Sequence, residues 1–269
     1  MKKLSFVVVA LAAMVLASCG GNKTNQNAEE QTDSVKTFEQ EQIEANIKVQ
    51  IDSIASELGK LKALPIFADT EDGTIALSEE EKLVKPEYLL DPAKANDAVT
   101  LSEKYRALAI LNVDKFVAKS YDMPTEAYDE AIAKLAADIN DPAFKAAQEE
   151  GPIAKNVQAF YDAEEESGRL NYFWQVATSA IVEQLYIMTQ NTDKFIAAFD
   201  DEAASNVTFR VICLQDAINR LTAYDEELVE VAEAIKPLGV LNALTVDELK
   251  AQLNELKAQI AESRAALVK

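Results

Sequence analysis

Residues 170–188 read Leu-Asn-Tyr-Phe-Trp-Gln-Val-Ala-Thr-Ser-Ala-Ile-Val-Glu-Gln-Leu-Tyr-Ile-Met, and they are the most apolar long segment in the second half of the chain. On a helix their apolar side chains point in every direction, and a helix that is apolar all round is buried. It is not a membrane span, because the polar side chains interspersed from Asn171 to Gln184 would lack partners in lipid. The segment therefore predicts the central, buried helix of a helical bundle.

Glu183 is the only charged residue within this segment. Burying an unpaired carboxylate is costly in free energy, so the side chain needs either a basic partner or access to water. We expect the partner to be Arg106, Arg169 or Arg210, or else a solvent-filled groove beside Glu183.

Toward the N-terminus, helical periodicity gives way to a different kind of segment. Apolar residues from Ile43 to Leu61 are spaced three or four apart and trace one face of a long helix. Residues 63–97 contain three of the seven prolines and predict a short irregular insertion. Within it, Ser78 and Glu81 form a capping box, which predicts a brief helix that stops before Pro86.

From Thr100 onward the sequence predicts helix almost throughout. Thr100 and Glu103 form a capping box for a helix that runs to about Asp122. The next helix begins at Pro124 and ends near Asn140.

The last predicted helix begins after Thr245, which forms a capping box with Glu248, and its apolar residues keep heptad spacing to Leu267. This seam packs inside the protein's own bundle, with the first helix as one candidate neighbour, or it mediates self-association as a dimeric coiled coil; we favour the first interpretation. Because the loops are short, neighbouring helices are expected to be antiparallel. The predicted fold is all-α, an antiparallel bundle of roughly seven to nine helices over residues 35–269.

Composition restricts the chemistry. The net charge of −20 disfavours binding to nucleic acid, so no nucleic-acid partner is expected. The absence of histidine excludes Ser-His-Asp and Cys-His catalysis and histidine-based metal sites. Cys19 and Cys213 are the only cysteines, and nothing near Cys213 in the sequence would lower its pKa. We expect no cofactor, no metal ion and no catalytic residue.

Four residues are candidates for binding: Tyr105, Arg106, Trp174 and Glu183. Arg106 lies beside an apolar run, where it either binds an anionic ligand or pairs with Glu183; the second alternative is more economical. Trp174 and the aromatic residues around it have spacings that suit a hydrophobic core, which we favour. They also suit the aromatic-lined cleft of a glycosidase, which needs two placed carboxylates.

The N-terminus has the layout of a secretory signal. Lys2 and Lys3 precede an apolar run over residues 4–17 that is too short to span a bilayer. The motif that follows, Leu16-Ala17-Ser18-Cys19, resembles the lipobox of bacterial lipoproteins. The resemblance implies that residues 1–18 are a signal peptide, that Cys19 is acylated, with palmitate among the chains, and that the membrane is a partner through this anchor. Residues 19–34 are polar and predict a flexible tether.

Three further segments are similar to segments of all-helical lipoproteins from the Bacteroidetes: Lys85-Pro-Glu-Tyr-Leu-Leu, Ser102-Glu-Lys-Tyr-Arg-Ala-Leu-Ala-Ile and Gln184-Leu-Tyr-Ile-Met-Thr-Gln. That family has no assigned activity, so the resemblance implies a helical fold and an outer-membrane location without a mechanism. Gly20-Gly-Asn-Lys follows the cysteine where surface-exposed members have acidic residues, and this implies the periplasmic face.

We therefore expect a non-enzymatic cell-envelope lipoprotein, in which the helical domain binds or scaffolds an envelope protein or a small ligand. The alternative is a carboxylate-dependent hydrolase that acts on glycans in the periplasm.

Overall fold

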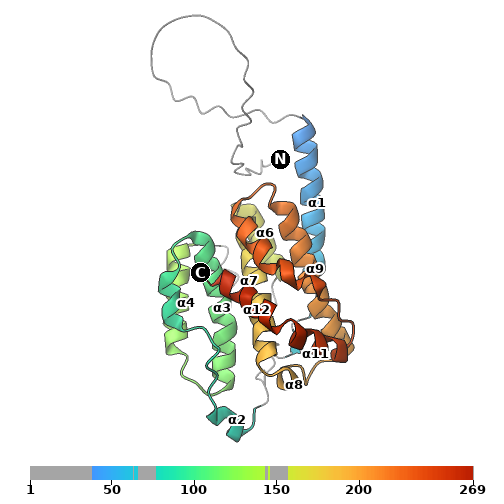
Figure 1. The fold of residues 1–269 in the computed structure, drawn as a ribbon. Coiled ribbons are helices and arrows are strands. Elements are labelled where there is room, and N and C mark those ends of the chain that lie inside the picture. The colour runs from blue at the N-terminus through green and yellow to red at the C-terminus, as the bar shows by residue number, and fades with distance from the viewer. Residues whose placement is uncertain (1–37, 63, 66–76, 143–144, 146–156, 269) are drawn as a thin grey trace, which may run out of the picture.

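The computed structural model describes residues 38–62, 64–65, 77–142, 145 and 157–268. All regular secondary structure in these residues is helical, so the predicted all-α, multi-helix bundle is confirmed (Figure 1). The signal-like segment, the lipobox with Cys19 and the tether lie outside the described residues.

The described helices differ widely in length, and two of them are 3-10 helices. In chain order they are α1 (Phe38–Lys60), α2 (Glu79–Leu83), η2 (Pro92–Asp97), α3 (Leu101–Ser120), α4 (Glu126–Ile139), α6 (Val157–Ser167), α7 (Leu170–Gln190), α8 (Thr192–Phe195), α9 (Asp201–Leu221), α10 (Glu227–Ile235), η4 (Lys236–Val240), α11 (Val246–Glu255) and α12 (Lys257–Leu267).

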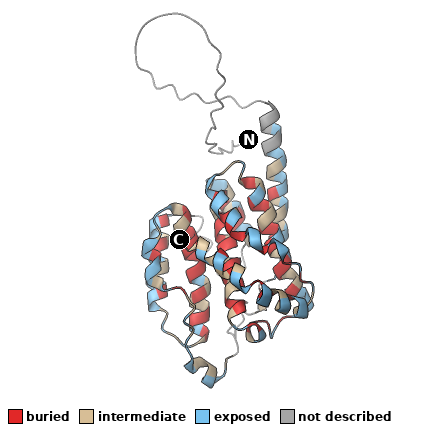
Figure 2. Ribbon diagram, viewed as in Figure 1, coloured by how far each residue is buried: buried red, intermediate tan, exposed pale blue. Residues whose placement is uncertain are grey.

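Helix α7 is the predicted central helix, and α3, α6, α9, α10 and α12 pack against it. Figure 2 shows it as a largely buried element between helices from both halves of the chain. The pairing with α3 is parallel, because Tyr105 stacks on Tyr172 near the start of both helices and Asp114 faces Glu183 farther along both. Helices α3 and α4, which follow each other in the chain, are antiparallel: Lys104 pairs with Asp138, and Lys115 with Asp129. Short loops therefore set the direction of consecutive helices, whereas the central α3–α7 pair is brought together by the whole fold.

The capping boxes that the sequence predicts are present. Ser78 and Glu81 cap α2, which ends at Leu83, before Pro86. Thr100 and Glu103 cap α3 in the same reciprocal way. The insertion also contains the 3-10 helix η2, which starts at Pro92; residues 63 and 66–76 of the insertion lie outside the described part.

The C-terminal segment forms two helices where one was predicted. Thr245 and Glu248 cap α11 as expected, but Leu256 stands between α11 and α12 with a non-helical backbone (φ −90°, ψ 2°). The seam residues Leu249, Leu253 and Ile260 are at most 1% exposed, and α12 packs against α7, α10 and η4. Packing inside the protein's own bundle is thus confirmed, and a dimer through the same residues would require both helices to leave the bundle. This break and the short helices α2 and α8 make the helices more numerous than the seven to nine expected.

Helix α1 lies along α6 and α9. Tyr161 of α6 donates a hydrogen bond to Asp52 over 2.7 Å, and Lys48 pairs with Glu165. Arg220 of α9 contacts Gln50. The N-terminal turns of α1 extend beyond the ends of these neighbours (Figure 1).

Candidate functional site

The four residues predicted for binding all lie inside the bundle. Tyr105 and Arg106 are on α3, Trp174 and Glu183 are on α7, and each is at most 1% exposed. The two helices pack against each other, but each of the four residues belongs to a different set of contacts.

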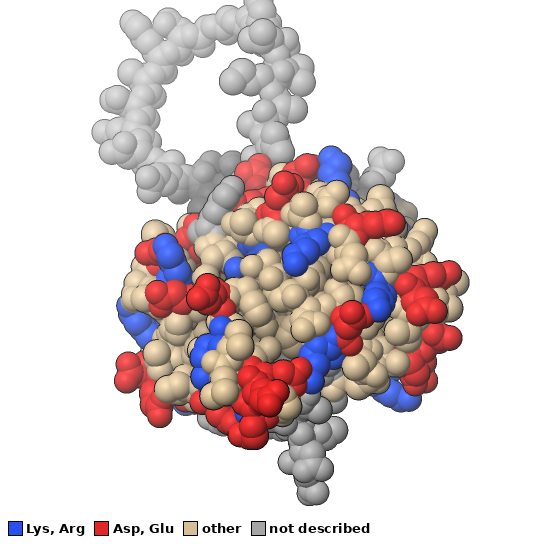
Figure 3. Space-filling view, turned by 60° about the horizontal axis from the view of Figure 1, so that its bottom comes forward, with Lys and Arg blue, Asp and Glu red and all other residues tan. Residues whose placement is uncertain are grey.

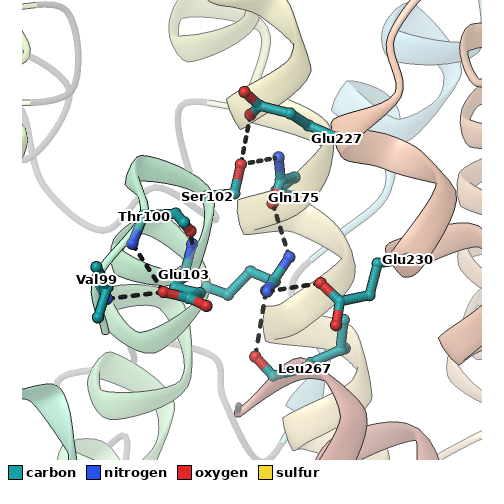
Figure 4. A network of polar contacts seen from close by, with 9 residues as sticks. Val99, Thr100, Ser102, Glu103, Gln175, Glu227, Glu230 and Leu267 are labelled. Carbon is teal, nitrogen blue, oxygen red and sulfur yellow. Dashed lines mark hydrogen bonds and ion pairs between the residues drawn. The ribbon is translucent and has the colours of Figure 1, made fainter. Parts of the chain in front are cut away.

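Arg106 is the centre of a polar network between α3, α7, α10 and α12 (Figure 4). Its Nη2 pairs with Glu230 at 3.1 Å, its Nη1 donates to the Gln175 amide oxygen at 3.3 Å, and its Nε donates to the carbonyl of Leu267 at 3.2 Å. Gln175 in turn donates to Ser102 over 3.0 Å. The guanidinium is thus held by groups of this chain, and the expected pairing of Arg106 with Glu183 is wrong.

Glu183 pairs with Arg264 of α12, whose Nε donates to Glu183 Oε2 over 2.6 Å. Arg264 Nη2 also lies 3.6 Å from Oδ2 of Asp114 on α3, and that oxygen accepts a hydrogen bond from the Leu90 amide over 2.7 Å. The side chains of Glu183 and Asp114 are fully buried, and that of Arg264 is 14% exposed. This cluster of Asp114, Glu183 and Arg264 is neither of the two arrangements predicted for Glu183.

The three arginines proposed as partners of Glu183 have other partners. Arg106 pairs with Glu230, Arg169 pairs with Asp141 at 3.2 Å, and Arg210 donates to the carbonyl of Lys62. The sequence does contain an indication that Arg264 is the partner. Arg264 follows Ser263, and Ser263 occupies a position of the heptad seam on a helix that is predicted to pack into the bundle. A basic side chain beside such a seam is placed to meet a buried acid.

Burial shifts the titration of the Asp114–Glu183–Arg264 cluster. It raises the pKa of Asp114 well above the usual range of an aspartate, and the neighbouring charge of Glu183 adds to the effect. Burial also raises the pKa of Glu183, while Arg264 acts in the opposite direction. The guanidinium lies 4.3 Å from the centre of the Tyr186 ring, a cation–π contact that helps to hold it in place.

A second buried acidic cluster was missed in the sequence. Glu164 of α6 is fully buried, and next to it Asp141 accepts a hydrogen bond from Tyr105 and pairs with Arg169. Burial, followed by the charge of Asp141, raises the pKa of Glu164 to about 9. Glu164 stands among Asp162, Glu165 and Glu166, and nothing in the sequence distinguishes it from these neighbours.

Trp174 belongs to an aromatic cluster between α6 and α7. Its ring meets those of Phe173 and Tyr161 edge-on, at centroid distances of 4.9 Å and 6.0 Å, and Phe160 packs on Phe173 at 5.6 Å. All four rings are at most 2% exposed. The favoured interpretation as core is therefore confirmed for Trp174 and Phe173, while Tyr172 and Tyr186 of the same predicted set are partly buried and pack against the core.

Reactive or metal-binding groups are not evident in the described part of the chain. Cys213 is buried, and burial raises the pKa of its thiol to about 11, which disfavours the reactive thiolate. In the same residues, no group of three or more His, Cys, Asp or Glu side chains is placed to hold a metal ion.

Comparison with known proteins adds no family: no protein-family model, no curated protein and no solved structure matches this chain. None of the described helices combines the length and apolar character that crossing a bilayer requires.

Proposed function

We propose that this chain is a non-enzymatic lipoprotein of the bacterial cell envelope, anchored through acylated Cys19. The observation that carries the proposal is Leu16-Ala17-Ser18-Cys19 at the end of a short apolar run preceded by two lysines. Residues 1–18 are the signal peptide, residues 19–34 are the tether, and the helical domain follows. By the family resemblance, the anchor lies in the outer membrane and the domain faces the periplasm.

The acyl chains supply the attachment to the membrane. Removal of residues 1–18 takes away two lysines and no acid, so the mature chain has a charge of −22 and is repelled by anionic headgroups. Two or three buried acyl chains, at about 0.8 kcal/mol per methylene, outweigh this repulsion and give stable anchoring. The polar tether then separates the folded domain from the headgroups.

The helical domain acts as a binding or scaffold module for an envelope protein or a small ligand. The internal contacts of its buried polar residues support a structural role for Tyr105, Arg106, Trp174 and Glu183. On the face shown in Figure 3, acidic side chains gather around the margin, and basic side chains lie both among them and within the largely uncharged middle. A surface of this kind suits a protein partner better than nucleic acid.

The alternative, a glycan hydrolase, needs two carboxylates that reach a sugar and a water molecule. The two acidic clusters described above have their carboxyl groups buried, at 0–4% exposure for Asp114, Glu183, Asp141 and Glu164. No observation in the described residues favours this alternative over the lipoprotein.

Substituting Cys19 tests the anchor. In a bacterial host, the wild-type chain is expected in the outer-membrane fraction and to incorporate a palmitate analogue, because the thiol takes the first acyl group. Cys19→Ser removes that thiol and is expected to abolish labelling and membrane association. Cys213→Ser is the matched control, because it changes the other cysteine, which is buried in the domain, and should leave both readouts unchanged.

Equal membrane association of the wild type and Cys19→Ser would contradict the proposal. So would loss of the label in Cys213→Ser with retention in Cys19→Ser, which would place the acyl group on the wrong cysteine.

A further inference from the structure

The two buried acidic clusters have the same composition. One contains Asp114, Glu183 and Arg264, and the other contains Asp141, Glu164 and Arg169. In the first, two carboxyl groups share Arg264, and in the second, Arg169 pairs with Asp141 beside Glu164. In the first cluster, two carboxylates and one guanidinium would leave a net negative charge in the protein interior, which is strongly unfavourable.

In the first cluster, each carboxyl group has one oxygen with a donor and one without. Asp114 Oδ2 accepts from the Leu90 amide at 2.7 Å, and Glu183 Oε2 accepts from Arg264 at 2.6 Å. Their other oxygens, Asp114 Oδ1 and Glu183 Oε1, are buried and have no hydrogen-bond partner among the described residues. Both carboxyl groups contact the same guanidinium, so they are neighbours. If Asp114 is protonated, its O–H group can donate a hydrogen bond to Glu183. Both orphaned oxygens then have a hydrogen-bond partner.

In the second cluster the two acids differ more clearly. Asp141 accepts a hydrogen bond from Tyr105 and pairs with Arg169 at 3.2 Å, as expected for an ionised carboxylate. Neither oxygen of Glu164 has a hydrogen-bond partner in the described part of the chain, although its side chain is fully buried. An ionised Glu164 in this position would be an uncompensated buried charge, whereas a protonated one can donate to Asp141.

We propose that each cluster retains one proton in the folded protein at neutral pH, on Asp114 and on Glu164, and that the helical domain is therefore stabilised by protons as its surroundings acidify. Asp141 and Glu183 stay ionised, each beside its arginine. The first cluster is then electrically neutral, because its orphaned oxygens become a donor and an acceptor. In the second cluster, one of the two orphaned oxygens of Glu164 becomes a donor and no buried charge remains on that residue. The two protons therefore stabilise the folded state, because it binds them more tightly than the unfolded chain does.

The charged and titratable groups around the first pair support this assignment. They come from several elements: Arg264 of α12, Tyr186 of α7, Tyr128 of α4, and Tyr88, which is influenced by Tyr121. Burial raises the pKa of Tyr88 above its ordinary value and that of Tyr128 to about 12, so neither tyrosine ionises near neutrality. Around the second pair stand Arg169 and Tyr105, and burial raises the pKa of Tyr105 as well. Arg264 is thus the positive charge that faces the first pair among the described residues, and Arg169 pairs with Asp141 in the second.

The direction of the pH effect follows from proton linkage. In the unfolded chain, Asp and Glu release their protons at about pH 4. The folded pKa of Glu164 is about 9, and that of Asp114 is also raised, so between these limits the folded protein binds more protons than the unfolded chain. Stability therefore decreases as the pH rises through this window. The stabilisation that the two protons provide is fully present in acid and is lost as the pH rises above the folded pKa values.

Infrared difference spectroscopy of the purified full-length protein between H₂O and D₂O at neutral pH tests the proposal directly. A protonated carboxylic acid has a carbonyl stretch distinct from that of a carboxylate, and this stretch shifts on deuteration, whereas the ester carbonyls of the acyl chains do not shift. The wild type should show acid bands from two carboxyl groups. Asp114→Asn should remove one and Glu164→Gln the other. Glu79→Gln is the control, because the Glu79 side chain is 90% exposed and far from both clusters in the sequence, and its removal should leave the acid bands unchanged.

Urea unfolding at about pH 5.5 and about pH 8.5 gives the second readout. The wild-type midpoint should be lower at the higher pH, and this difference should shrink in the Asp114→Asn/Glu164→Gln double variant, whose amides donate the same hydrogen bonds at every pH. The Glu79→Gln control should retain the wild-type difference.

The wild-type spectrum is decisive by itself, so the test does not depend on the folding of a variant. The absence of acid bands at neutral pH would overturn the proposal. Acid bands that persist in the double variant would also overturn it, because the protons would then be on other groups.

Discussion

Arg264→Gln should destabilise the domain by about 3–5 kcal/mol at neutral pH, because it leaves a buried carboxylate without its counter-charge. The Glu183 side chain is fully buried and its contact with Arg264 is 2.6 Å, so no water replaces the lost partner without opening the α7–α12 interface. Since small domains are stable by about 5–15 kcal/mol, a large share of the total would be lost. Urea unfolding followed by circular dichroism measures the change.

Two comparisons identify charge as the cause. Arg220→Gln is a matched control, because Arg220 is 39% exposed and pairs with Asp216 of its own helix, so its loss should be about 1 kcal/mol or less. The double variant Arg264→Gln/Glu183→Gln has no uncompensated carboxylate and should be more stable than Arg264→Gln alone. A double variant that is less stable than the single one would show that packing of the arginine, and not its charge, is what matters.

Trp174→Ala should cost about 3–5 kcal/mol, the range for truncating a large aromatic side chain in a packed core. The Trp174 ring is fully buried and loses edge-on contacts with Phe173 and Tyr161, on which the α6–α7 contact depends. Circular dichroism is the suitable probe, because Trp174 is the only tryptophan and its fluorescence disappears with it.

Leu83→Ala is the control for Trp174→Ala, since Leu83 is 80% exposed and its truncation should change stability by at most about 0.5 kcal/mol. If Trp174→Ala were as stable as this control, the tryptophan would contribute little to the core, and its role as a binding residue would regain support.

Local features of the fold could be predicted from the sequence because they depend on neighbouring residues. The all-round apolar character of residues 170–188 identifies the central helix α7. The capping boxes at Ser78, Thr100 and Thr245 mark three helix starts, because each requires only a residue and its third neighbour. These are short-range rules, and the structure follows them.

Arrangements between distant segments could not be predicted in the same way. Glu183 and Arg264 are 81 residues apart, and their pairing depends on how α12 crosses α7. The parallel packing of α3 on α7 likewise has no local signal. The break at Leu256 interrupts a heptad pattern that continues on both sides, so the pattern alone predicts one helix where the chain forms two.

The candidate binding residues show the same difference between local features and contacts that join distant segments. Tyr105, Arg106, Trp174 and Glu183 stand out in the sequence because they are polar or aromatic within apolar segments. Residue type does not reveal whether such a side chain faces a ligand or another part of the chain, and here the partners are internal: Asp141, Glu230, Tyr161 and Arg264. The burial of Glu164 could not be predicted, because nothing in the sequence distinguishes it from the acidic residues beside it.

The lipid anchor at Cys19 is tested most directly by the intact mass of the mature protein purified from membranes. We expect a chain that begins at Cys19 and is heavier than its amino-acid sequence by the mass of two or three acyl chains with their glycerol. A chain that retains residues 1–18, or one with an unmodified Cys19, would contradict the proposed lipoprotein.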